Sequence, residues 1–320
     1  MKAPERGLVS VVIAGYDCES FIEPTLTSVF EQTYFKGHNE SRRTMEVVFV
    51  DDGSTDGTRR VVERFAPAVT YLPVPHGGVS SARNAGIRAT NGQYVALLDH
   101  DDLWALDKIE RQVAVLDAHP DLGLVFTRAK VVGDPSHVPV IPPPGGGWEA
   151  LFAQGIAQKD PAHLYARLLL DNFIPYSSVL ARRVALPVDG PFKPHLRYSE
   201  DHDFLLRLSE LKRFAFITEP LTTYTVRPGR ATERMADMRL EDLEILADNL
   251  HRNPWLHRHD GDGMRRREAA VLKEAGYWLL RERRGSEARP LLRRAWKMAP
   301  FDVRLPAYLI ATLGAAGGRG

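Results

Sequence analysis

The chain has 320 residues, of which 44% are hydrophobic and 26% charged, a composition typical of a globular protein rather than a disordered or fibrous one. Its formal net charge of +1 gives no reason to expect a nucleic-acid partner, because nucleic-acid-binding proteins usually carry a basic excess on one face. The single cysteine, Cys18, excludes an internal disulfide and a cysteine-built zinc site, and it favours a reducing compartment, with the cytoplasm as the default. No apolar run reaches the roughly 18 residues of a transmembrane helix, so no membrane-spanning segment is predicted.

Short apolar runs alternate with helical stretches over the first hundred residues. Strands are predicted at about 9–16, 45–53 and 94–102, with amphipathic helices between them at about 21–33 and 58–66. Runs of β-branched residues joined by crossover helices are typical of a buried parallel sheet. The sequence therefore predicts an α/β fold with a doubly wound, mostly parallel, Rossmann-like sheet.

The next hundred residues are less regular. The proline- and glycine-rich stretch from Gly133 to Gly147 predicts a long loop of the kind that often covers a site. A helix is expected at about 161–171, and the segment RFAFITEPLTTYTV is expected to form a last strand.

Beyond Pro228 the pattern changes to helices only, and the domain prediction is an α/β domain over 1–228 followed by a helical C-terminal region over 229–320. The last two predicted helices resemble a single tetratricopeptide-like hairpin, but a solenoid needs at least three such repeats. A helical appendage is therefore favoured. The predicted helices run at about 233–251, 264–284 and 286–298.

Each predicted parallel strand ends in polar or acidic residues. Tyr16 and Asp17 follow the first strand, Asp51 and Asp52 the second, and the segment 99–102, Asp-His-Asp-Asp, the third. The carboxyl ends of the strands of a doubly wound sheet meet at the ligand-binding crevice. Clustered carboxylates repel one another unless a cation lies among them, so a cation site is expected at this edge.

The strongest of these signals is the Asp-His-Asp-Asp segment. If it is extended, Asp99 and Asp101 project to one side, where they could flank a divalent ion whose other ligands are diphosphate oxygens and water. Such an ion neutralises the charge that develops on a departing diphosphate. Alternatively, Asp101 or Asp102 could cap a helix that starts near Leu103, and the two roles can coexist. An EF-hand calcium loop is excluded, because its sixth position would be Trp104 instead of glycine.

Two other motifs allow both a structural and a functional interpretation. The segment DDGSTDGT is typical of a strand-to-helix turn, although one of its first two aspartates could accept a hydrogen bond from a nucleobase or a ribose hydroxyl. In the segment SEDHDF, Ser199 could cap a helix with acidic residues in its first turn. A carboxylate there could instead take the proton of an acceptor in an in-line displacement.

Four ordered segments, which span roughly residues 8–228, together resemble the family 2 glycosyltransferases, whose nucleotide-binding half has the GT-A fold. The segments are VSVVIAGYD, VVFVDDGSTDGT, GGVSSARNAGIRATNGQYVALLDHDD and YSEDHDFLLRL. The resemblance implies inverting transfer of a hexosyl or N-acetylhexosaminyl group from a nucleoside-diphosphate sugar, expected to be a UDP-sugar, with bound Mg²⁺ or Mn²⁺. It implies as acceptor a hydroxyl of a glycan or lipid-linked glycan, as in cell-envelope polysaccharide synthesis. The nucleotide-sugar half would be about 1–102 and the acceptor half about 103–228.

The resemblance also implies roles for residues of the nucleotide-sugar half. Tyr16 and Asp17 would lie against the base, Asp52 would hydrogen-bond it, and Arg83 would help to hold the nucleotide. In this chain Ala14-Gly15-Tyr16-Asp17 stands where the family usually has Pro-Thr-Tyr-Asn.

The metal and the reaction would depend on four acidic residues. Asp99 and Asp101 would form the family's Asp-Xaa-Asp motif, with Asp101 as the nearer metal ligand. Asp201 would be the catalytic base, and Glu200 would orient or bind the acceptor. The histidine that usually follows the last strand is missing, and Arg227 lies in its neighbourhood.

Other functions fit the sequence less well. A sugar-phosphate nucleotidyltransferase would need a glycine-rich basic loop where AGYDCES stands, and no dinucleotide-binding or phosphate-loop motif is present. A nucleotide-sugar-binding module without turnover is disfavoured by the intact acidic motifs. The histidine-rich segment 251–259 is expected to be a solvated loop rather than a metal site.

The C-terminal region allows two interpretations of its apolar end, residues 305–318. With the basic helices before it, this stretch could form a peripheral contact with an anionic membrane surface, where many glycan acceptors are anchored. Alternatively, its apolar residues pack inside the protein while the arginines face water.

Overall fold

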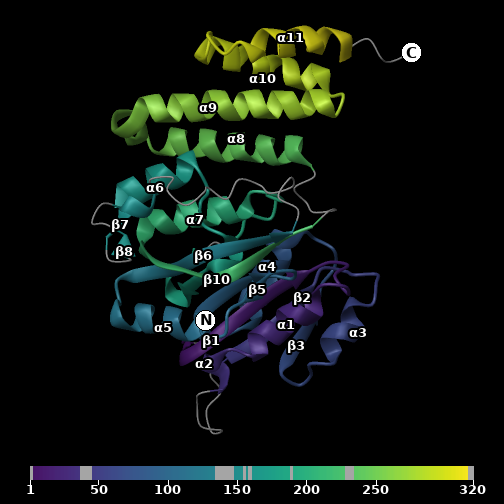
Figure 1. The fold of residues 1–320 in the computed structure, drawn as a ribbon, viewed down its shortest axis with the longest axis vertical. Helices are drawn as coiled ribbons and strands as arrows, with labels where there is room; N and C mark the ends of the chain where they lie inside the picture. The colour runs from purple at the N-terminus through teal and green to yellow at the C-terminus, as the bar shows by residue number, and fades with distance from the viewer. Residues whose placement is uncertain are drawn as a thin grey trace. The chain divides into compact units, whose positions relative to one another are not determined.

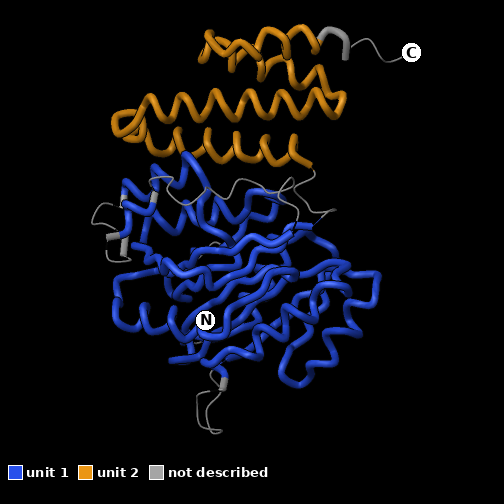
Figure 2. The backbone as a smooth tube through the Cα atoms, in the orientation of Figure 1, with its two compact units in different colours: residues 1–228 blue, residues 229–320 orange. Residues whose placement is uncertain are grey.

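The computed structural model describes residues 3–36, 45–133, 148–153, 156–157, 161–187, 190–227 and 234–315. The chain divides into two compact units, Met1–Pro228 and Gly229–Gly320, which are blue and orange in Figure 2. Most of the loop predicted over 133–147 lies outside the described residues.

The first unit is built on a mixed sheet (Figure 1). Within the described residues ten strands are connected in the order β3-β2-β1-β4-β9-β6-β10-β8-β7, with β5 paired to β10. The strands are β1 (Glu5–Gly15), β2 (Met45–Asp51), β3 (Val69–Pro73), β4 (Gly92–Asp99), β5 (Leu103–Trp104), β6 (Leu122–Gly133), β7 (Phe152–Ala153), β8 (Ile156–Ala157), β9 (Leu180–Arg182) and β10 (Arg213–Val226).

The long strands pair in parallel, as the sequence predicts. Neighbours among β3, β2, β1 and β4 are parallel, and so are β6 and β10. The antiparallel β9 lies between β4 and β6 and joins these two parallel groups into one sheet. The predicted α/β fold class, with a mostly parallel sheet, is therefore confirmed, although β3, β6 and the short strands were not predicted.

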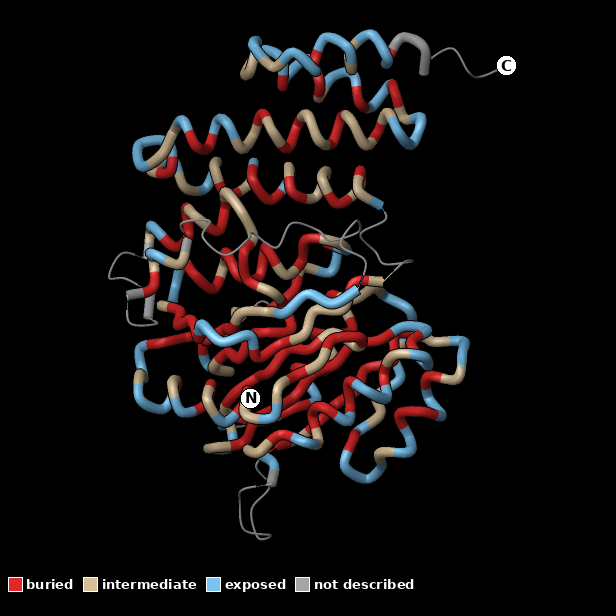
Figure 3. Tube along the Cα trace, viewed as in Figure 1, coloured by how far each residue is buried: buried red, intermediate tan, exposed pale blue. Residues whose placement is uncertain are grey.

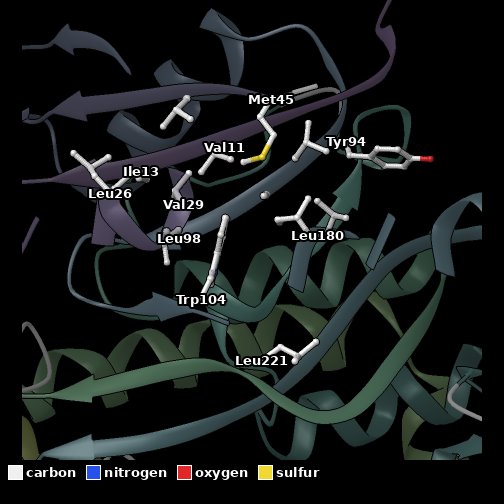
Figure 4. Close-up of a cluster of buried hydrophobic side chains, with 14 of the residues drawn as sticks. Val11, Ile13, Leu26, Val29, Met45, Tyr94, Leu98, Trp104, Leu180 and Leu221 are labelled. Atoms are coloured by element: carbon white, nitrogen blue, oxygen red, sulfur yellow. The ribbon is translucent and has the colours of Figure 1, made fainter. Parts of the chain in front are cut away.

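Helices cover both faces of the sheet. They are α1 (Ile22–Phe30), α2 (Thr33–Lys36), α3 (Thr58–Glu63), α4 (Val79–Ala89), α5 (Lys108–Ala118), α6 (Pro161–Leu170) and α7 (Glu200–Leu211). One face packs a large apolar cluster from β1, β2, β4, α1, α3 and α5, in which Ile13, Leu26 and Trp104 are buried (Figure 4). A smaller cluster with Val50 and Ala82 lies under α4.

The central strands are buried on both faces, which explains their continuous β-branched sequence. Residues 9–14 of β1 are all buried, and buried residues line the middle of the sheet in Figure 3. Helix α4 lies so close to the sheet that a Cβ atom on Gly86 would come within 2.5 Å of Val12 Cγ1. This close approach requires glycine at position 86 and fixes α4 against β1.

The described part of the second unit is helical. Its helices are α8 (Met235–Arg252), α9 (Trp255–Arg281), α10 (Gly285–Met298) and α11 (Arg304–Ala315). An apolar cluster of its own, including Leu272, Leu292 and Leu305, joins them. The expected solvated loop over 251–259 is wrong, because α9 begins at Trp255 and only Asp260 has a non-helical backbone.

Candidate active site

The carboxyl ends of β1, β2 and β4 bring the predicted motifs to one edge of the sheet. In the strand register Ala14 pairs with Asp99 and Gly15 pairs with Asp51. The residues that follow these three strands therefore leave the sheet side by side, as expected for a doubly wound fold.

Asp52 organises the loop in front of α4. Its two carboxylate oxygens accept hydrogen bonds from the amides of Gly77 (2.8 Å) and Gly78 (3.0 Å), and His76 Nδ1 lies 3.0 Å from Oδ2. The positive φ of 86° at Gly78 permits the turn into the helix. The Tyr16 ring, 46% exposed, lies 4.7 Å from the His76 ring, centroid to centroid. Sequence reasoning missed His76, which together with Tyr16 presents an aromatic surface beside Asp52.

Asp17 holds the following loop through backbone amides. With a positive φ of 46°, it directs Oδ1 to the amides of Thr55 (2.7 Å) and Asp56 (3.4 Å). Its own amide donates to Ser54 Oγ at 3.0 Å. The charge at position 17, where the family usually has an amide, is thus used inside the protein to fix the 54–56 turn.

Arg83 joins two acidic motifs that lie far apart in the sequence. From α4, its Nη2 donates to Asp99 Oδ1 at 2.7 Å, and its Nη1 donates to Glu200 Oε1. Its guanidinium carbon lies 3.6 Å from the centre of the Tyr176 ring, and the side chain is only 6% exposed. We call the set Arg83, Asp99 and Glu200 the Arg83 bridge. It brings the end of β4 next to the first turn of α7.

Asp201 lies beside this bridge in the first turn of α7. Its Oδ1 accepts from the amide of His202 at 2.7 Å, and its Oδ2 lies 3.4 Å from Asn172 Nδ2. Burial by the surrounding protein and the negative charge of Glu200 raise the pKa of Asp201 to about 7. A carboxylate with this pKa can take a proton near neutral pH.

Glu200 is buried, and burial raises the pKa of its carboxyl even though Arg83 opposes the shift. Its Oε2 has no hydrogen-bond partner among the described residues, and neither has the buried hydroxyl of Tyr176. Glu200 and Tyr176 both contact Arg83, and each leaves one buried polar atom without a partner, which indicates that a substrate group or water completes this site. Tyr176 carried no signal in the sequence, because its position depends on contacts with α4.

The Asp-His-Asp-Asp segment forms a turn, so its predicted extended geometry is wrong. The amide of Asp102 donates to the carbonyl of Asp99 at 3.3 Å, and residues 103–104 form the short strand β5. The alternative of a capped helix starting near Leu103 is therefore also wrong. Buried Asp102 accepts hydrogen bonds from Ser177 Oγ (2.6 Å) and from the amide of Thr225 (2.9 Å), which ties the turn to β10.

Within this turn Asp101 pairs with an arginine of its own. Arg227 Nε donates to Asp101 Oδ2 at 2.7 Å, and the Asp101 side chain is only 4% exposed. Arg227 Nη2 also lies 2.8 Å from His100 Nε2. Burial lowers the pKa of His100, which is consistent with a neutral ring that accepts from Arg227.

Asp99 and Asp101, the two aspartates of the Asp-Xaa-Asp motif, offer carboxylate oxygens, which are the ligands that hard divalent cations prefer. No group of three or more acidic, histidine or cysteine side chains placed to hold a metal occurs in the described ranges. Asp99 and Asp101 would hold such an ion together with further oxygen ligands, such as those of a diphosphate or water.

Comparisons with known proteins agree with this architecture. Residues 10–161 match the family model described as "Glycosyl transferase family 2". An uncharacterized glycosyltransferase of Rickettsia typhi is 25% identical over 241 residues, which is 75% of this chain and 70% of the relative.

Two solved structures share the fold. One is S. aureus TarS 1-349 in complex with UDP-GlcNAc, with a TM-score of 0.63 and 17% identity over 97% of this chain and 92% of that chain. The other is the mannosyltransferase PcManGT from Pyrobaculum calidifontis in complex with GDP-Man and Mn2+, with a TM-score of 0.61 and 20% identity over 98% of this chain and 87% of that chain. Residues 10–161 belong to glycosyl transferase family 2, and the protein is a glycosyltransferase.

Proposed function

We propose that the chain transfers a sugar with inversion from a UDP-sugar to an acceptor hydroxyl, with Asp201 as the catalytic base. The observation that carries the proposal is the Arg83 bridge, which places Asp201 and its neighbour Glu200 beside Asp99 at the end of β4. The nucleotide-sugar half, 1–102, and the acceptor half, 103–228, would meet at this bridge.

The proposed reaction is a single in-line displacement. The acceptor oxygen forms a bond to the anomeric carbon while the bond from that carbon to the diphosphate oxygen breaks, and the acceptor proton passes to Asp201. The pKa of about 7 supports this role, because an ordinary aspartate would be too weak a base. Glu200, held by Arg83, would bind or orient the acceptor through its Oε2 atom.

The donor would lie along the ends of β1, β2 and β4. Tyr16 and His76 offer an aromatic surface for the base, and the exposed ring of Tyr16 supports that position. Asp52 would hydrogen-bond the base with the lone pairs that the Gly77 and Gly78 amides leave available. Asp17, which holds the 54–56 turn, would also lie against the base, and Arg83 would help to hold the nucleotide.

A Mg²⁺ or Mn²⁺ ion, when bound, would neutralise charge on the leaving nucleoside diphosphate. Asp101 and Asp99 would hold it. The partial exposure of the Asp99 side chain, 29%, supports access from the donor side.

For the acceptor we propose a glycan or lipid-linked glycan at the cytoplasmic face of a membrane, reached through peripheral contact of the second unit. None of the helices in the described parts of the chain has the length and apolar character needed to cross a bilayer. Phe301 and Val303, 94% and 87% exposed, lie between α10 and α11, with exposed Lys297 nearby in the sequence. Exposed apolar side chains next to basic ones suit the interface of an anionic membrane.

Asp201→Asn tests the proposal. The variant is expected to fold and to bind UDP as the wild type does, yet to transfer sugar at least about a hundredfold more slowly, the usual loss for a general base. Transfer would be followed by release of UDP in the presence of candidate acceptors, and UDP binding by calorimetry. Asp203→Asn in the same helix is unsuitable as a control because Asp203 pairs with Arg207, so the exposed Glu210→Gln serves instead.

Near-normal transfer by Asp201→Asn would contradict the assignment of the base. Retention of the anomeric configuration in the product, measured by NMR, would contradict the single displacement. A wild-type protein that binds UDP-sugars but neither transfers nor hydrolyses them would be a binding module.

A further inference from the structure

Arg227, directly after β10, is held at the 99–102 turn by three different contacts. Its Nε donates to Asp101 Oδ2 at 2.7 Å, and its Nη2 donates to His100 Nε2 at 2.8 Å. Its guanidinium carbon lies 3.9 Å from the centre of the Phe21 ring, a cation–π contact. The Arg227 side chain is 20% exposed, so the guanidinium held by these contacts still reaches the protein surface.

His100 fixes the orientation of Arg227. Its Nδ1 lies 3.3 Å from the carbonyl oxygen of Ala14 and must donate to it, which leaves Nε2 as an acceptor. The backbone of β1 thus determines the tautomer of His100, which accepts a hydrogen bond from Arg227. The positive charge of Arg227 is therefore held in place at the end of the sheet before any ligand binds.

The ion pair between Arg227 and Asp101 should weaken the binding of a metal ion to Asp101. Arg227 and a divalent ion are both cations that seek the same carboxylate, so binding of one weakens binding of the other. Two of the five guanidinium N–H groups make the hydrogen bonds described above. A planar guanidinium with donors left over is well suited to bind phosphate oxygens.

We propose that Arg227 is a built-in cation of the donor site, which competes with the divalent ion for Asp101 and binds the donor diphosphate. This inference rests on the proposed function, because it assigns Asp101 to the metal and the same corner to the diphosphate. Arg227 would then supply part of the positive charge that otherwise comes from the ion alone.

Two titrations on the full chain test the inference. Mn²⁺ binding without nucleotide would be measured by electron paramagnetic resonance of free Mn²⁺, and UDP binding in EDTA by calorimetry. In Arg227→Met, Mn²⁺ is expected to bind at least about tenfold more tightly, because its competitor is gone, and UDP in EDTA at least about tenfold more weakly. Arg111→Met, which removes an arginine paired with Glu219 away from this turn, should leave both affinities unchanged.

Arg227→Lys keeps the charge and guards against a folding defect in the methionine variant. It is expected to remain within about threefold of the wild type for Mn²⁺, because the competing charge remains. Unchanged Mn²⁺ affinity in Arg227→Met, or a lysine variant that behaves as the methionine variant does, would overturn the inference. If the wild type binds no UDP in either medium, the proposed donor fails, while the Mn²⁺ titration still decides the role of Arg227.

Discussion

Among the described ion pairs, the first unit buries a pair more deeply than the second unit does. In the first unit Arg83 and Glu200 are only 6% and 8% exposed and form a buried ion pair at the edge of the sheet. In the second unit the pair of Arg265 and Asp262 is 71% and 70% exposed, one turn apart on α9. Burying charges is costly, so a buried cluster at the end of parallel strands indicates a selected function, whereas exposed pairs on a helix contribute little to stability.

The units also differ in where they expose large apolar side chains. In the second unit Phe301, Val303 and Ile310 all belong to the last 20 residues of the chain and are 94%, 87% and 69% exposed. In the described part of the first unit the two most exposed large apolar residues, Val184 and Leu211 at 76% and 67%, lie far apart in the sequence. A local group of exposed apolar residues is typical of an interaction surface, whereas scattered ones are ordinary.

The largest expected effect on stability comes from the buried pair. Arg83→Met should lower the free energy of unfolding by about 3–5 kcal/mol, because it leaves the buried Glu200 without its counter-ion. Arg265→Met, the matched change in the second unit, should leave the urea midpoint unchanged within error, because water solvates its partner. Urea unfolding followed by circular dichroism measures both. If Arg83→Met and Arg265→Met unfold at the same urea concentration, the two ion pairs contribute equally to stability and the contrast between the units is wrong.

A smaller effect is expected on the binding of the protein to anionic membranes. Sedimentation with vesicles rich in phosphatidylglycerol should show binding of the wild type that weakens with added salt. Combining Phe301→Ser with Val303→Ser should lower the partition coefficient about tenfold or more, because two exposed apolar side chains no longer enter the interface.

The control for this experiment comes from the first unit. Val184→Ser combined with Leu211→Ser removes comparable exposed apolar residues and should leave vesicle binding unchanged. If the wild type stays in the supernatant at low salt, or if both double variants lose binding equally, the exposed residues of the second unit do not form a membrane contact.

The strand ends were predictable from sequence because each depends on local pattern. A buried run of β-branched residues followed at once by aspartate identifies both the strand and its position at the ligand edge, as for Asp51 and Asp99. The same local reasoning placed helix α7 and the acidic residues in its first turn.

The contacts that complete the site were not predictable in this way. Arg83 reaches Glu200 across 117 positions, and Arg227 reaches Asp101 across 126, so no local period or spacing connects them. The turn at 99–102 replaced the expected extended segment because Asp102 is bound by Ser177 and by the end of β10. Tertiary contacts of this kind override local preference.

The central claim, that the Arg83 bridge assembles a site in which Asp201 acts as the base, is tested most directly by the pH dependence of sugar transfer at saturating donor and acceptor. The pKa of Asp201 is raised to about 7, so its carboxylate is protonated below that pH and cannot accept a proton. The wild-type rate should therefore fall about tenfold per pH unit below about pH 7 and level off above it. In Asp201→Asn the small residual rate should lack this acidic limb. An acidic limb of the same slope and midpoint in Asp201→Asn would contradict the account, because another group would then be the base.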